Sequence, residues 1–148
     1  MKNLTFSAAI AAPKKKVWDI MLDPETYKTW TGVAWAGSYY VGEWKEGNEL
    51  RFVSPEGSGT LAKLLVCRPH DHIVAEHIAI LLPGGFEDRD SEQAKSWTGS
   101  IEEYSFTEKD GIANLLITMK VYPEWEAMFS TDWPKALAKL KEICEQEL

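Results

Sequence analysis

The chain has 148 residues, 45% of them hydrophobic and 26% charged, and a formal net charge of −7 at pH 7. This length suits one domain spanning residues 1–148, large enough to bury a core of its own. The negative charge disfavours nonspecific binding to nucleic acid or to an anionic membrane surface, so we expect neither as a partner.

The first residues imitate a secretion signal, but they are better explained as a β-strand. Asn3, Thr5 and Ser7 interrupt the apolar run, and three lysines follow where a cleavage site would be expected. The alternation in LTFSAAI instead predicts a first strand. No apolar segment approaches the roughly 20 residues that span a bilayer. Cys67 and Cys144 lack the spacing of a disulfide framework, which is typical of a reducing compartment. We therefore predict a cytoplasmic protein.

Two short helices are predicted after this strand. Pro13 suits the first position of a helix, and an apolar stripe follows, formed by Val17, Trp18, Met21 and Leu22. Asp23-Pro24-Glu25 predicts the start of a second helix, which ends at Gly32. The three lysines before the first stripe are interpreted as a solvated helix start.

After Gly32 the hydrophobic period changes to two, which predicts six further strands. They cover residues 35–41, 49–53, 60–68, 72–82, 96–107 and 111–121. The short breaks between them require antiparallel neighbours, because a parallel crossover needs about a dozen residues or more. The longest break, residues 83–95, is acidic and polar, and is predicted to be a mobile loop.

A long helix is predicted to close the chain over about residues 131–146. Its apolar positions step by four, three and four, through Trp133, Leu137, Leu140 and Cys144. Pro123 opens either this helix or an introductory turn, and Pro134 either kinks the helix or marks its first turn. An antiparallel sheet with one apolar face needs a cover, and no other predicted element is long enough to supply it.

Several motifs carry a family resemblance along nearly the whole chain. They are Ala12-Pro13 with Val17-Trp18, Asp23-Pro24 with Trp30, the run GEWKEG at residues 42–47, and Trp133-Pro134-Lys135-Ala136-Leu137 continuing to Leu140-Lys141. In this order they resemble the START-like (SRPBCC, Bet v 1-like) superfamily. Within it, the chain is most similar to the family named after the C-terminal domain of the activator of heat-shock-protein-90 ATPase.

The resemblance implies an α+β helix-grip fold. In this fold a curved antiparallel sheet of about seven strands surrounds the long C-terminal helix, and two short helices follow the first strand. It also implies a cavity between sheet and helix, closed at one end by the short helices, with Trp30 at its rim or lid.

Side-chain alternation predicts which residues face that cavity. With Glu76 and Lys63 directed to water, the inward residues of their two strands are Ile73, Ala75, His77, Ala79, Ala62, Leu64 and Val66. In the strand at 96–107, Tyr104 and Phe106 share one face with Glu102, while Trp97 and Ile101 share the other. We favour the first face as the inward one.

The resulting candidates for ligand binding come from separate segments of the chain: Trp30, Phe52, Leu64, His77, Tyr104, Met119, Trp125, Phe129 and Trp133. The alternative is that these side chains fill a solid core. His77 can hydrogen-bond a ligand or act as a general base, or it can have a structural role in which a neighbouring hydroxyl or carboxylate satisfies it. Glu102 becomes its partner if it points inward. No residue is assigned a catalytic role.

Two other clusters suggest metal ligands at first sight. Cys67, His70, Asp71 and His72 lie on one predicted hairpin tip, whereas a structural zinc site normally uses two separated pairs. The acidic residues at 87–92 lack the spacing of a calcium loop. We therefore predict no metal and no cofactor.

Three functions remain open. The first is carriage or sensing of a small hydrophobic or aromatic molecule held in the cavity. The second, implied by the resemblance, is an interaction with a chaperone whose ATPase the domain stimulates. The third is a cyclase-like or hydrolase-like enzyme that uses His77. We rank them in this order.

Overall fold

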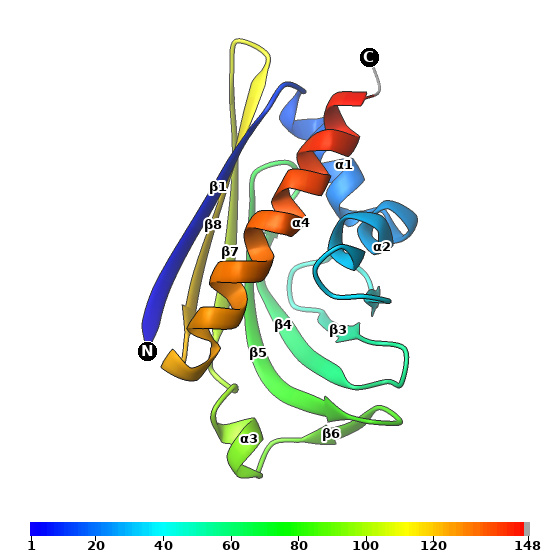
Figure 1. Ribbon diagram of the computed structural model, residues 1–148, viewed down its shortest axis with the longest axis vertical. Helices are drawn as coiled ribbons and strands as arrows, with labels where there is room; N and C mark the ends of the chain where they lie inside the picture. The colour runs from blue at the N-terminus through cyan, green and yellow to red at the C-terminus, as the bar shows by residue number, and fades with distance from the viewer. Residues whose placement is uncertain (147–148) are drawn as a thin grey trace.

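A curved antiparallel sheet forms the frame of the protein, which we describe from a computed structural model covering residues 1–146 (Figure 1). Its strands run in the order β1-β8-β7-β5-β4-β3-β2, and β6 pairs with the outer end of β5. The eight strands are β1 (Lys2–Ile10), β2 (Tyr39–Val41), β3 (Glu49–Val53), β4 (Gly59–Arg68), β5 (His72–Leu82), β6 (Phe86–Asp88), β7 (Ile101–Lys109) and β8 (Ile112–Val121).

Helix α4 lies across the concave face of this sheet and packs against β1 (Figure 1). The helices are α1 (Lys14–Leu22), α2 (Pro24–Gly32), α3 (Glu92–Lys95) and α4 (Glu126–Gln146), and the 3-10 turn η1 (Pro123–Trp125) precedes α4. The buried face of α4 consists of Phe129, Trp133, Ala136, Leu137, Leu140 and Cys144. Within residues 1–146, no helix has the length and apolar character needed to cross a membrane. The predicted α+β helix-grip architecture is confirmed.

The second short helix begins where the sequence predicted, whereas Pro13 precedes α1 and is not its first residue; tertiary contacts complete the helix ends. Asp23 accepts hydrogen bonds from the backbone N–H groups of Glu25 (2.9 Å) and Thr26 (3.2 Å), so it caps α2. At α1 the cap comes from the sheet, because the Lys14 N–H donates to Glu108 Oε1 at 2.8 Å. The Lys14 ammonium also pairs with Asp71. Lys14 therefore belongs to a junction between α1 and the sheet.

Several predicted boundaries were wrong. Helix α4 begins at Glu126 rather than near residue 131, so Pro134 lies inside the helix. The strand predicted at residues 35–41 is reduced to β2, and β7 begins at Ile101 because residues 96–100 form a turn after α3.

Residues 83–95, predicted as a mobile loop, instead form β6 and α3. Gly84 and Gly85 adopt φ values of 88° and 87°, which allow the chain to turn back tightly onto β5. Arg51 of β3 then holds Glu87 of β6 at 3.0 Å, and the Ser91 hydroxyl caps α3. Polar composition suggested a loop, but these polar groups bind neighbouring elements.

Two irregularities in the β4–β5 pairing overturn two inward predictions. The register shifts between Leu61 and Ala62, and again between Leu64 and Val66. Each shift inserts an extra residue, so the alternation of side chains reverses beyond it. Val66 consequently leaves the inner face, where Cys67 packs instead. Ala79 joins a small separate cluster with Val53, Leu61 and Leu81, while Ile80 faces the main core.

Trp133 is expected to contribute strongly to stability. It is 3% exposed, and α4 docks on the sheet through it. Replacing it by Ala removes a large buried ring, so Trp133→Ala should lower the free energy of unfolding by about 3–5 kcal/mol. Denaturant unfolding measures the change, with Lys135→Ala on the exposed side of the same helix as the control. An unchanged midpoint for Trp133→Ala would contradict the packing described.

The cap of α2 gives a second prediction. Asp23→Ala removes the acceptor of two backbone N–H groups and should cost about 1 kcal/mol of stability. Asp19→Ala is the matched control, because Asp19 only pairs with Lys15 on the surface at 2.8 Å, an interaction worth at most about 0.5 kcal/mol. An equal decrease in the free energy of unfolding of the two variants would show that Asp23 does not cap α2.

Candidate functional site

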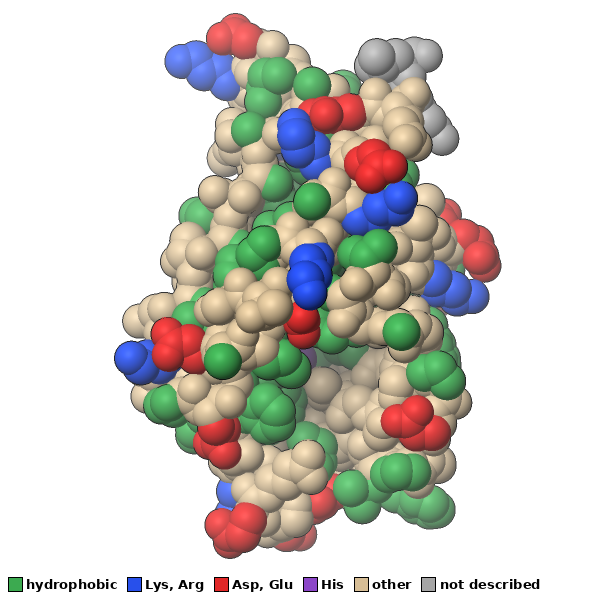
Figure 2. Space-filling model, viewed as in Figure 1, with side chains coloured by type: hydrophobic (Ala, Val, Ile, Leu, Met, Phe, Trp, Pro, Cys, Tyr) green, Lys and Arg blue, Asp and Glu red, His purple; other side chains and the backbone are tan. Residues whose placement is uncertain are grey.

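A pocket of about 470 Å³ lies between α4, the short helices and the concave face of the sheet. It opens in the lower half of the view, where the surface is hollowed between α4 and strands β3 to β5 (Figure 2). Ligand pockets in proteins commonly enclose about 300–1,000 Å³. The space is therefore large enough for a small organic molecule.

Aromatic rings form a large part of the pocket wall. Of the seven tryptophans in the chain, all but Trp18 line the pocket: Trp30, Trp35, Trp44, Trp97, Trp125 and Trp133. Two of these are fixed by hydrogen bonds to the backbone, from Trp30 Nε1 to the Met21 carbonyl (3.1 Å) and from Trp125 Nε1 to the Ser96 carbonyl (2.8 Å). Such anchored rings make a rigid, largely preformed wall.

The rings also support one another. Trp97 packs against Phe129 at a centroid distance of 5.8 Å and against Trp125 at 5.6 Å. Trp133 contacts Trp35 at 5.3 Å and Trp30 at 6.1 Å. Face and edge contacts at these distances are favourable. Both groups of rings belong to the pocket wall.

Seven of the nine predicted candidates line this pocket: Trp30, Phe52, His77, Tyr104, Trp125, Phe129 and Trp133. The other two, Leu64 and Met119, are fully buried and belong to the core beneath the pocket. Trp30 is 2% exposed and forms part of the inner wall, so its expected place at a rim or lid is wrong. Whether these residues bind a ligand stays a prediction.

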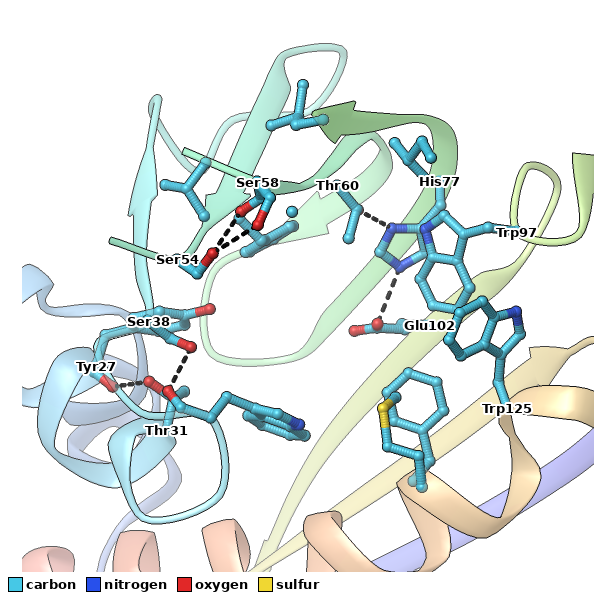
Figure 3. Close-up of a pocket in the computed structure, with 18 of the residues that line it drawn as sticks. Tyr27, Thr31, Ser38, Ser54, Ser58, Thr60, His77, Trp97, Glu102 and Trp125 are labelled. Atoms are coloured by element: carbon cyan, nitrogen blue, oxygen red, sulfur yellow. Dashed lines mark hydrogen bonds and ion pairs between the residues drawn. The ribbon is translucent and has the colours of Figure 1, made fainter. Parts of the chain in front are cut away.

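A chain of polar side chains crosses the apolar wall (Figure 3). The Thr60 hydroxyl lies 2.6 Å from His77 Nδ1, and His77 Nε2 lies 2.9 Å from Glu102 Oε1. The Tyr104 hydroxyl donates to the second oxygen of Glu102. Glu102 faces Ala75 across the β5–β7 pairing, which makes His77 its diagonal neighbour on the same face. The inward direction of Glu102, left open by the sequence, is thereby determined.

The protonation states follow from burial and from these contacts. Burial raises the pKa of the Glu102 carboxyl, but the Coulomb interaction and hydrogen bond with His77 and the hydrogen bond from Tyr104 outweigh burial and leave the pKa below its ordinary value. Burial, followed by the nearby Glu102, raises the pKa of Tyr104 well above its usual range. Glu102 is therefore an anion, and Tyr104 keeps its proton.

The carboxylate only accepts hydrogen bonds, so Nε2 of His77 must carry a proton. The Thr60 hydroxyl can donate to Nδ1 of a neutral imidazole or accept from an imidazolium. The cluster can therefore hold a proton or pass it along. The same order of hydroxyl, imidazole and carboxylate also occurs in hydrolases. An enzyme that used His77 would employ this arrangement.

Other polar groups lie elsewhere on the pocket wall. Ser54 and Ser58 hydrogen-bond each other (2.9 Å) across from His77 (Figure 3). Within residues 1–146, the indole N–H groups of Trp44, Trp97 and Trp133 are buried and lack an acceptor. Since they are sealed from solvent, a ligand reaches them only after a side chain moves. Among the described residues, the polar side chains open to the pocket are the hydroxyls, the Gln93 amide and Glu102.

Sequence reasoning missed four aromatic residues of the wall: Tyr27, Trp35, Trp44 and Trp97. Trp97 was placed on the other face of a strand, but it lies in the turn before β7 and packs in a tilted arrangement against the His77 ring at a centroid distance of 4.5 Å. Trp35 was assigned to a strand that does not form there, and Trp44 was noted only for the GEWKEG motif. The high tryptophan content was the available signal, because so many large rings either fill a core or line a cavity.

The two clusters considered as metal ligands have other contacts. His72 Nε2 lies 2.8 Å from a Glu103 oxygen, and the Cys67 thiol donates to the Trp44 carbonyl at 3.4 Å. In the acidic segment, Glu87 binds Arg51 and Arg89, both at 3.0 Å. These contacts explain both clusters without an ion.

Comparisons of the whole fold give similar structures at low sequence identity. The Aha1 dimer from Colwellia psychrerythraea has a TM-score of 0.73 at 17% identity, covering 99% of this chain and 98% of that one. A crystal structure of a Mesorhizobium loti protein has a TM-score of 0.72 at 13% identity, covering 96% of both chains. A Chromobacterium violaceum protein gives 0.71 at 15% identity, covering 98% of both. These similarities establish the fold alone.

Sequence comparison identifies the family. None of the curated protein sequences compared matches the chain. Residues 11–145, however, match the sequence profile described as "Activator of Hsp90 ATPase homolog 1-like protein". The matched region runs from the residue before Ala12-Pro13 into the last turns of α4, and it includes every motif on which the resemblance was based. The chain therefore belongs to the family of activator of Hsp90 ATPase homolog 1-like proteins, within the START-like superfamily.

Proposed function

We propose that this protein binds a small hydrophobic or aromatic molecule in the pocket between α4 and the sheet, as a carrier or sensor. The observation that carries the proposal is an open volume of about 470 Å³ walled by six tryptophans. Protein interiors are normally packed to the density of organic crystals. A space of this size inside an aromatic wall is therefore what a binding site needs and what a solid core lacks.

The chemistry of the wall supports an apolar ligand. The rings offer flat surfaces for stacking, and a few polar side chains on β4, β5 and β7 can fix an orientation. Removing apolar surface from water contributes about 25 cal/mol per Å² buried. The cytoplasmic location predicted from the sequence is part of this proposal.

The family description favours a second candidate, docking onto a chaperone. Its printed name refers to an activator of the Hsp90 ATPase, and a docking surface would not require the pocket. Adding the protein to the chaperone and following ATP hydrolysis tests it. We expect no stimulation of ATP hydrolysis. Stimulation that persists in a variant whose pocket is filled by a larger side chain would favour the second candidate over the first.

Binding of a neutral fluorescent probe tests the proposed function. N-phenyl-naphthylamine should bind with micromolar-range affinity and quench tryptophan emission. Ile80 lines the pocket, so Ile80→Trp should place a larger ring in the open space and weaken binding at least tenfold. Leu65→Trp is the control, because Leu65 is 43% exposed and outside the pocket.

Thermal unfolding of both variants checks that their folds are intact. An intact parent protein that binds no probe would reject the proposed function. Equal binding by Ile80→Trp and Leu65→Trp would place the probe elsewhere.

A further inference from the structure

We propose that the natural ligand is an organic cation, in which an apolar or aromatic body carries an ammonium group that pairs with Glu102. This inference rests on the proposed function and specifies the ligand class that the pocket selects. It follows from the distribution of charge around the pocket, from the unused hydrogen-bonding capacity of Glu102 and from the surrounding rings.

The charge around the pocket is one-sided. Among the described residues that line it, Glu102 is the sole acidic side chain, and none is Lys or Arg. The Thr60 hydroxyl bonds His77 Nδ1 and His77 Nε2 donates to Glu102, so the one carboxylate of the pocket is held in place by hydrogen bonds. A carboxylate in an apolar site strongly disfavours an anionic ligand and favours a cationic one.

Glu102 also has acceptor positions left for a ligand. Its two oxygens offer about four lone-pair positions. His77 occupies one position on Oε1, and Tyr104 occupies one on Oε2. The side chain lines the pocket and is 14% exposed. Its carboxylate lies on the pocket side of the His77 ring in Figure 3, where a ligand N–H can reach it.

The rings near this carboxylate suit a cation as well. The Tyr104 hydroxyl donates to Glu102, and Trp97 packs against His77 at a tilt of 48°. Trp133 in turn contacts Tyr104 at a centroid distance of 6.1 Å. Aromatic faces attract a positive charge within about 6 Å, tryptophan most strongly. Trp97 and Trp133 line the same pocket as Glu102, so a ligand ammonium paired with Glu102 would share the pocket with tryptophan rings, while its apolar body occupies the rest of the space.

Three ligands that differ in one group test this inference. Naphthylmethylamine is protonated, naphthylmethanol is neutral, and naphthoate is anionic, with the same ring in each. Their ability to displace the neutral probe is measured under one set of conditions, in which the amine is protonated and naphthoate is ionised. We expect the amine to bind at least about tenfold more tightly than the alcohol, as for a charge-assisted hydrogen bond, and the carboxylate to bind most weakly.

Glu102→Gln should abolish the preference for the amine, because Gln keeps the size and acceptor oxygen of Glu but loses the charge. Glu103→Gln is the matched control: it removes the same charge from the neighbouring residue, whose side chain pairs with His72 outside the pocket. The control should retain the preference. If Glu102→Gln fails to fold, the ranking of the three ligands by the parent protein decides.

Two failures can be told apart. If the neutral probe binds but the amine binds no better than the alcohol, the cation inference is overturned and the proposed function stands. If neither the probe nor any of the three ligands binds, the proposed function itself is rejected. A preference for the amine that persists in Glu102→Gln would also overturn the assignment of Glu102.

Discussion

Trp133 contacts aromatic rings from four separate parts of the chain, and the position of α4 depends on these contacts. The rings are those of Phe6 in β1, Trp30 in α2, Trp35 after α2 and Tyr104 in β7, at centroid distances of 5.3 to 6.3 Å. The side chain thereby connects the closing helix to both the sheet and the short helices. The same ring forms part of the pocket wall, so stability and the proposed binding depend on one interaction.

This arrangement explains how the protein keeps an open space without losing its fold. Below the pocket, aliphatic side chains such as Leu64, Ile117 and Met119 are completely buried and form a dense core. Around the pocket, flat rings brace one another or are anchored by hydrogen bonds, so they cannot easily collapse inward. Cavities cost stability roughly in proportion to their size. A rigid aromatic wall above a well-packed aliphatic core keeps the space open and leaves it available to a ligand.

Glu102 introduces a second constraint, because a buried carboxylate is tolerated only when it is paired. His77 and Tyr104 supply that pairing, and Thr60 completes it from β4. These four residues come from three strands, so the cluster also ties β4, β5 and β7 together on the inner face. The fold needs this network for its own stability. The same network presents the carboxylate of Glu102 to any molecule that occupies the pocket.

The sequence by itself predicted the order of the main elements, their antiparallel pairing and the cap at Asp23, and it favoured the inward face of Tyr104, because turn chemistry and hydrophobic period are local properties. The tertiary structure decided the rest. Irregularities in the β4–β5 pairing turned Ile80 rather than Ala79 toward the pocket, and a turn brought in Trp97. Alternation along one strand cannot reveal an extra residue that arises only when two strands pair, nor how a distant loop closes over them.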